Sequence, residues 1–127
     1  MKTSLLLLIF LPLFANASGP CDGLKKNFLG RYSFIQTQTH NGSGEKGMFE
    51  ISKWSTGLVF TPYENGRPGP QSPIKFGEGL ANGKPTCLLS LGQTVFKATL
   101  IDPINGHYVF TTNADGAPFS LDVRKAN

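Results

Sequence analysis

The C-terminal third of the chain alternates apolar and polar residues with a period of two. This alternation is typical of half-buried β-strands and predicts strands over residues 94–101, 107–112 and 117–124. The connections, residues 102–106 and 113–116, end in glycine and have the composition of hairpin turns. We therefore predict a β-meander whose apolar face carries Phe96, Ala98, Leu100, Tyr108, Phe110, Phe119, Leu121 and Val123.

Weaker alternation recurs upstream. It predicts further strands over residues 31–39, 46–54, 58–63 and 86–91, with at most a short edge strand at 74–76. On the face of the first strand, Tyr32 and Phe34 are followed by Gln36 and Gln38, so the far end of that face is expected to be wet.

Two segments interrupt the alternation. Residues 64–73 contain three prolines and two glycines, and residues 77–85 are rich in glycine, so both are predicted to be exposed loops. About eight short strands remain. They predict an all-β fold, either a small antiparallel β-barrel or a β-sandwich. A short helical turn is expected within residues 18–29, capped by Asp22 and ended by Gly30.

The N-terminus has the pattern of a secretory signal peptide. A basic Lys2 precedes a ten-residue apolar run, and Ala15, Asn16 and Ala17 form an A-x-A cleavage pattern. The run is too short to span a bilayer comfortably, which disfavours an uncleaved anchor. We expect residues 1–17 to be removed, residues 18–127 to form one β-domain, and the product to be secreted or periplasmic without stable membrane insertion.

Cys21 and Cys87 are the only cysteines of the chain. In an exported protein an even count indicates a disulfide, and no C-x-x-C spacing suggests a redox pair. A bridge across a loop of this length is worth about 4 kcal/mol in the chain-entropy model.

The charge balance is mildly basic, with a formal net charge of +4 for the whole chain. The basic residues are scattered, whereas nucleic-acid binding uses dense clusters. We therefore expect no nucleic-acid partner and only a weak bias toward anionic surfaces.

Residues 27–32, with the sequence NFLGRY, resemble the opening of lipocalins. In that family a short N-terminal helix leads through a glycine into the first strand of a barrel. Arg31 stands where lipocalins have tryptophan, and the chain is much shorter than a lipocalin. The resemblance implies this topology and, as a function, carriage of a small apolar ligand.

Catalytic chemistry has one candidate. In the predicted register, His107 lies near Asp122, and Ser120 is close enough in sequence to complete a triad. These residues are expected on a flat exposed face without an oxyanion hole, so a solvated histidine is favoured. The histidine and cysteine spacing gives no metal-ligand pattern. We expect no enzyme activity, no metal and no cofactor.

The candidate binding residues are Trp54, Tyr63, Glu64 and Arg67. Trp, Tyr and Arg are enriched at interface hot spots, and prolines stiffen the segment after Arg67. The alternative is that Trp54 and Tyr63 cap the end of a barrel core.

The function expected from the sequence is an exported binding module. An eight-stranded barrel is only just wide enough to be filled by side chains, and this chain is rich in phenylalanine. A packed interior would leave recognition to the loops and the outer face, as in a protein-binding or inhibitor-like domain. The alternative is the lipocalin-like carrier of a small apolar ligand.

Overall fold

A computed structural model describes residues 19–38, 44–112 and 118–126. The leader predicted over residues 1–17 lies outside this range. The elements are α2 (Asp22–Asn27), β1 (Gly30–Gln38), β2 (Glu45–Trp54), β3 (Gly57–Glu64), β4 (Arg67–Pro68), β5 (Ser72–Ala81), β6 (Lys84–Leu91), β7 (Thr94–Asp102), the 3-10 helix η1 (Pro103–Asn105), β8 (His107–Thr112) and β9 (Phe119–Lys125).

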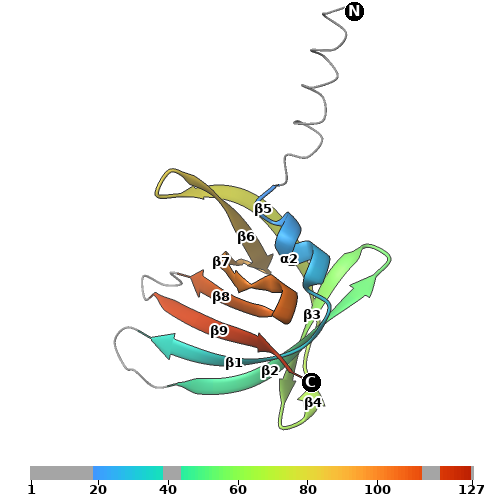
Figure 1. The fold of residues 1–127 in the computed structure, drawn as a ribbon. Coiled ribbons are helices and arrows are strands. Elements are labelled where there is room, and N and C mark those ends of the chain that lie inside the picture. The colour runs from blue at the N-terminus through green and yellow to red at the C-terminus, as the bar shows by residue number, and fades with distance from the viewer. Residues whose placement is uncertain (1–18, 39–43, 113–117, 127) are drawn as a thin grey trace, which may run out of the picture.

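The strands form one antiparallel sheet that closes on itself (Figure 1). The order β2-β1-β9-β8-β7-β6-β5-β3 is completed by pairing between β2 and β3, so eight strands form a ring. The predicted all-β fold is confirmed, and closure decides between its two forms in favour of the barrel. The shortest strand pairing in the ring is between β3 and β5, which share only two residue pairs, Val59 with Pro73 and Phe60 with Ser72.

The C-terminal meander is confirmed. Phe110 lies opposite Ala98 on β7 and Leu121 on β9, which is the register that keeps the apolar side chains on one face. The connection from β7 to β8 contains η1 and ends at Gly106, whose φ of 75° is left-handed. The second predicted turn, residues 113–116, lies outside the described residues.

The two segments predicted to be loops are mostly hairpins, and that prediction was wrong. Asn65 and Gly66 both have positive φ, as do Asn82 and Gly83, which is the geometry of a two-residue type I′ hairpin turn. The first turn joins β3 to the two-residue β4, which stands outside the ring. The second joins two long strands, β5 and β6.

The misreading has a physical reason. The prediction of loops rests on the general rarity of proline in strands, but a proline is tolerated where its missing N–H is not needed by a neighbouring strand. Pro73 stands near the start of β5 in the short seam with β3, and Pro68 belongs to the strand outside the ring. A glycine-rich composition likewise does not separate a loop from a hairpin with turn glycines.

Helix α2 covers one end of the barrel (Figure 1). Its Leu24 is fully buried, and Phe28 just after the helix is 1% exposed. The helix begins at Asp22 after Cys21, so the predicted cap at Asp22 is one residue too late.

The predicted disulfide is confirmed: Cys21 and Cys87 are bonded at 2.10 Å and tie this end to β6. None of the helices in the described part of the chain has the length and hydropathy of a membrane span.

Candidate functional site: an apolar cavity in the barrel

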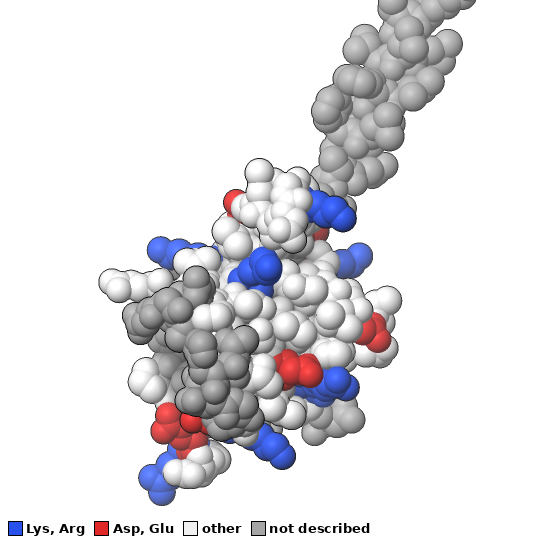
Figure 2. All heavy atoms as spheres, turned by 90° about the vertical axis from the view of Figure 1, so that its left-hand side faces the viewer, with Lys and Arg blue, Asp and Glu red and all other residues white. Residues whose placement is uncertain are grey.

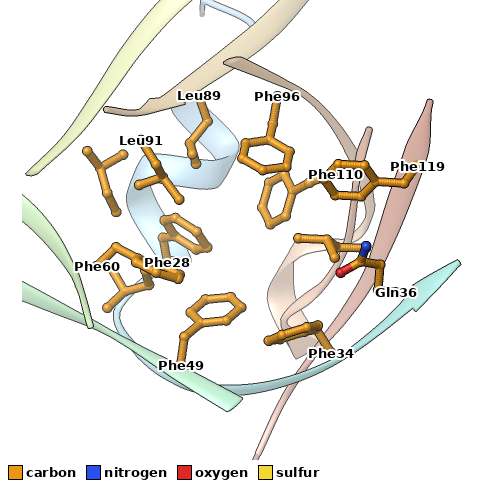
Figure 3. Close-up of a pocket in the computed structure, with 13 residues that line it drawn as sticks. Phe28, Phe34, Gln36, Phe49, Phe60, Leu89, Leu91, Phe96, Phe110 and Phe119 are labelled. Carbon is orange, nitrogen blue, oxygen red and sulfur yellow. The ribbon is translucent and has the colours of Figure 1, made fainter. Parts of the chain in front are cut away.

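The barrel encloses a cavity of about 240 Å³. Figure 3 shows side chains from around the wall pointing into one shared space. The lining is apolar with a single exception, and it comprises Phe28, Phe34, Gln36, Phe49, Ile51, Phe60, Ile74, Leu89, Leu91, Phe96, Phe110, Phe119 and Leu121.

This cavity corrects the prediction of a packed interior. The phenylalanines pair with neighbours around the wall: Phe49 contacts Phe60 at 5.0 Å and Phe34 at 6.0 Å between ring centroids. On the other side Phe96 lies 6.2 Å from Phe119. Because these ring contacts run between strands along the wall, the barrel axis stays open.

The α2 end of the barrel is closed by buried aromatic residues. Phe28 packs edge-on against Tyr108 at 5.6 Å and lies 5.5 Å from Tyr32. The Tyr32 hydroxyl donates a hydrogen bond to the Phe28 carbonyl at 2.8 Å, and the Tyr108 hydroxyl donates to the Pro103 carbonyl. Both rings are fully buried. These contacts fix η1 and the segment that carries Phe28 to the barrel wall.

Burial raises the pKa of both tyrosines at this end. For Tyr32, desolvation is the main cause, and the neighbouring Tyr108 raises the pKa further. For Tyr108, desolvation again dominates, while its hydrogen bond with Tyr32 acts in the opposite direction. Both phenols therefore stay neutral over the physiological range.

Among the residues that the structure describes, those at the opposite end of the cavity are less buried. Phe34, Gln36, Phe119 and Leu121 are only half-buried, in contrast to the fully buried side chains beside α2. They belong to the part of the barrel where β1 ends and β9 begins. We call this end the mouth. An apolar molecule entering here would have its deepest contacts with Phe28 and Ile51.

Gln36 is the only polar side chain in the lining. It follows Tyr32 and Phe34 on the inward face of β1, and its side chain makes no hydrogen bond with another described residue. Sequence reasoning placed it at a wet strand end but did not include it among the binding residues. The available signal was a polar residue at an inward position of an otherwise apolar alternation.

The predicted surface residues separate into two places. Tyr63 is half-buried on the outer face, where its hydroxyl donates to Glu50 at 3.2 Å and Arg31 lies 5.5 Å from its ring centroid. Glu64 pairs with Arg67 across the β3–β4 turn, and both are exposed.

Trp54 does not join this group. It is 50% exposed and lies six residues along β2 from Met48, the partner of Tyr63, a separation of about 20 Å in a strand. Neither Trp54 nor Tyr63 belongs to the core cluster. The alternative that both cap the core is therefore wrong.

The candidate triad does not assemble. His107 Nε2 lies 2.9 Å from Asp122 Oδ1, as the register predicted, and Arg124 Nε lies 3.6 Å from the same oxygen. Ser120, however, lies beside Thr111, with 3.2 Å between the two hydroxyl oxygens. Since Ser120 pairs with Thr111 and His107 with Arg124 in the strand register, the serine is out of line with the imidazole.

The described residues contain no group of three or more His, Cys, Asp and Glu side chains placed to hold a metal ion. On the side where β1 ends, Lys and Arg side chains are scattered among uncharged ones (Figure 2).

Comparison with protein-family models, curated proteins and solved structures found no match. The helix-glycine-strand arrangement implied by the lipocalin resemblance is present in α2, Gly30 and β1, but no family is shown.

Proposed function

We propose that this protein binds a small apolar molecule inside its barrel and carries it outside the cytoplasm. The observation that supports this proposal is the cavity, which twelve apolar side chains and Gln36 line. It favours the carrier alternative over the surface-binding module, because a surface-binding module is the expectation only for a barrel with a filled interior.

The cavity volume limits the size of the ligand. An apolar cavity of about 150 Å³ is enough to stay dry and take up benzene, whereas pockets for drug-sized ligands measure roughly 300–1,000 Å³. At about 240 Å³ this barrel lies between the two. The fitting class is a compact hydrophobic molecule of one or two rings or a short alkyl chain.

The exported location is part of the same proposal. The Cys21–Cys87 disulfide is compatible with an oxidising compartment.

The test is uptake of 1-aminonaphthalene, a neutral two-ring probe whose fluorescence changes in a dry apolar site. We expect saturable binding with one site per chain. Leu91→Trp should reduce the affinity at least roughly tenfold, because the larger side chain occupies space in the cavity that the ligand needs. The matched control is Val95→Trp, at an exposed position of the adjacent strand.

Probe uptake and melting temperature together distinguish loss of the binding site from loss of the fold. If Leu91→Trp keeps or raises the melting temperature while it abolishes uptake, the cavity is the binding site. Equal uptake by Leu91→Trp and Val95→Trp would contradict the proposal, because the probe would then bind elsewhere.

A second candidate function rests on the β3–β4 hairpin. Arg31, Glu50 and Tyr63 hold one another in place there, beside the exposed Glu64 and Arg67. Such preorganised aromatic and arginine side chains suit a protein partner. Tyr63→Ala with Arg67→Ala should weaken capture of that partner without a change in probe uptake. Loss of uptake in this double variant would contradict a separate surface role.

A further inference from the structure

We propose that the ligand is a neutral amphiphile whose single polar group hydrogen-bonds Gln36 at the mouth, with its apolar body toward Phe28. This inference rests on the proposed function and specifies the chemical class of the molecule. It follows from the position of one carboxamide in an otherwise apolar lining.

The strand register places Gln36 at the mouth. Its partners are Leu121 on β9 and Glu45 on β2, so all three side chains belong to the inward face near the end of β1. Figure 3 shows the Gln36 amide near Phe34, among the side chains that surround the cavity. A molecule that fills the space in front of α2 therefore presents its outer end to this amide.

The carboxamide of Gln36 determines which polar group the outer end of the ligand can carry. It offers two N–H donors and a carbonyl acceptor, so it can bond a hydroxyl, a carbonyl or an amide. Without such a partner, a ligand that covers Gln36 would remove the amide from water uncompensated, which is unfavourable. A pure hydrocarbon would fit the apolar part of the cavity, but it would leave the Gln36 amide without a hydrogen-bond partner.

Charge at the mouth argues against an anionic head. Glu45 lies directly opposite Gln36, and its carboxylate would repel a second carboxylate bound there. The described lining residues include no lysine or arginine to offset this repulsion. The nearest basic residue on β2, Lys46, pairs with Ile35, and both belong to the outward face. The expected head is therefore neutral.

The experiment compares octane, octanol and octanoate as competitors for bound 1-aminonaphthalene. In the unchanged protein, octanol should displace the probe better than octanoate. Gln36→Met keeps the length of the side chain and removes the amide. We expect it to lower the ratio of octanol affinity to octane affinity roughly tenfold, because a hydrogen bond in a dry site is lost.

Two further variants control this comparison. Thr37→Val changes the exposed neighbour on the outward face of β1 and should leave the ratio unchanged. Glu45→Gln should increase octanoate affinity several-fold while octanol affinity stays constant. Melting temperatures of all variants show whether each one is folded.

The outcomes are distinguishable. An unchanged octanol-to-octane ratio in folded Gln36→Met, or preferred binding of octanoate by the native protein, overturns the role of Gln36 while the cavity remains a binding site. If neither the probe nor any of the three competitors binds, both this inference and the proposed function fail.

Discussion

Phe110 and Thr111 are neighbours with opposite environments. Phe110 is 4% exposed and borders the cavity, with ring contacts to Phe28 and Phe96. Thr111 lies on the outer face, where it meets Ser120. In a period-two strand, adjacent positions therefore make unequal contributions to stability.

Phe110→Ala should destabilise the protein by about 3–5 kcal/mol, because it enlarges an existing void and removes aromatic contacts. Thr111→Ala should destabilise it by less than about 1 kcal/mol. Urea unfolding of both variants measures this difference. Equal and small effects would mean that the strand faces are assigned wrongly.

The raised pKa values of Tyr32 and Tyr108 predict a loss of stability at alkaline pH. A phenol whose pKa is higher in the folded state ionises first in the unfolded chain, so the stabilisation is complete below an unfolded pKa of about 10 and falls as pH rises above it. Tyr32→Phe should reduce this dependence, although loss of the hydrogen bond to Phe28 costs about 1 kcal/mol at neutral pH.

Melting temperatures between neutral pH and the alkaline range test this prediction. Titration of tyrosine absorbance provides a second measurement. If Tyr32 and Tyr108 ionised near the ordinary tyrosine pKa in the folded protein, the prediction for the buried pair would be contradicted.

Helix α2 is a short plug that cannot be stable alone. It has six residues, and isolated helices below about 12–15 residues are marginal in water. Its position depends on buried Leu24, on Phe28 and on the disulfide from Cys21. The closed end of the cavity is therefore held by packing and by one covalent bond.

Loss of this bond should weaken the closed end. The double variant Cys21→Ser with Cys87→Ser should be destabilised by about 2–4 kcal/mol and should bind the probe more weakly. The intact mass of the exported protein should match a chain that starts at Ser18 and lacks two hydrogens. Two thiols that react with an alkylating agent in the native protein would contradict the bridge.

The closed barrel couples ligand binding to global stability. Each of the eight strands of the ring pairs with two neighbours, so one continuous sheet surrounds the cavity, and β4 lies outside this ring. A ligand that contacts several strands at once binds only the folded state, so it must shift the unfolding equilibrium.

A competitor such as octanol, at about a hundredfold above its Kd, should stabilise the protein by about 2.7 kcal/mol. Thermal denaturation with and without ligand measures the shift. Leu91→Trp serves as the control and should show almost none. A ligand that is bound yet leaves the melting temperature of the native protein unchanged would bind the folded and the unfolded chain equally well, which would contradict a site formed by the barrel.

The sequence alone determined the features that depend on local spacing. Alternation assigned Phe96, Phe110 and Leu121 to one face, because strand side chains point to opposite sides in turn. The two cysteines determined the only possible intramolecular bridge. Even the misread segments contained their turn signals, Asn65-Gly66 and Asn82-Gly83.

Only the tertiary structure decided between a filled and a hollow interior. Which face of a strand is apolar follows from its own residues, but the volume left between opposite walls depends on closure of the ring and on how far α2 enters it. Gln36 shows the same limit: its inward position was readable from β1, yet its place at a cavity mouth arises from contacts with β2 and β9. Enclosed volume is a property of many residues distant in sequence, so no local pattern encodes it.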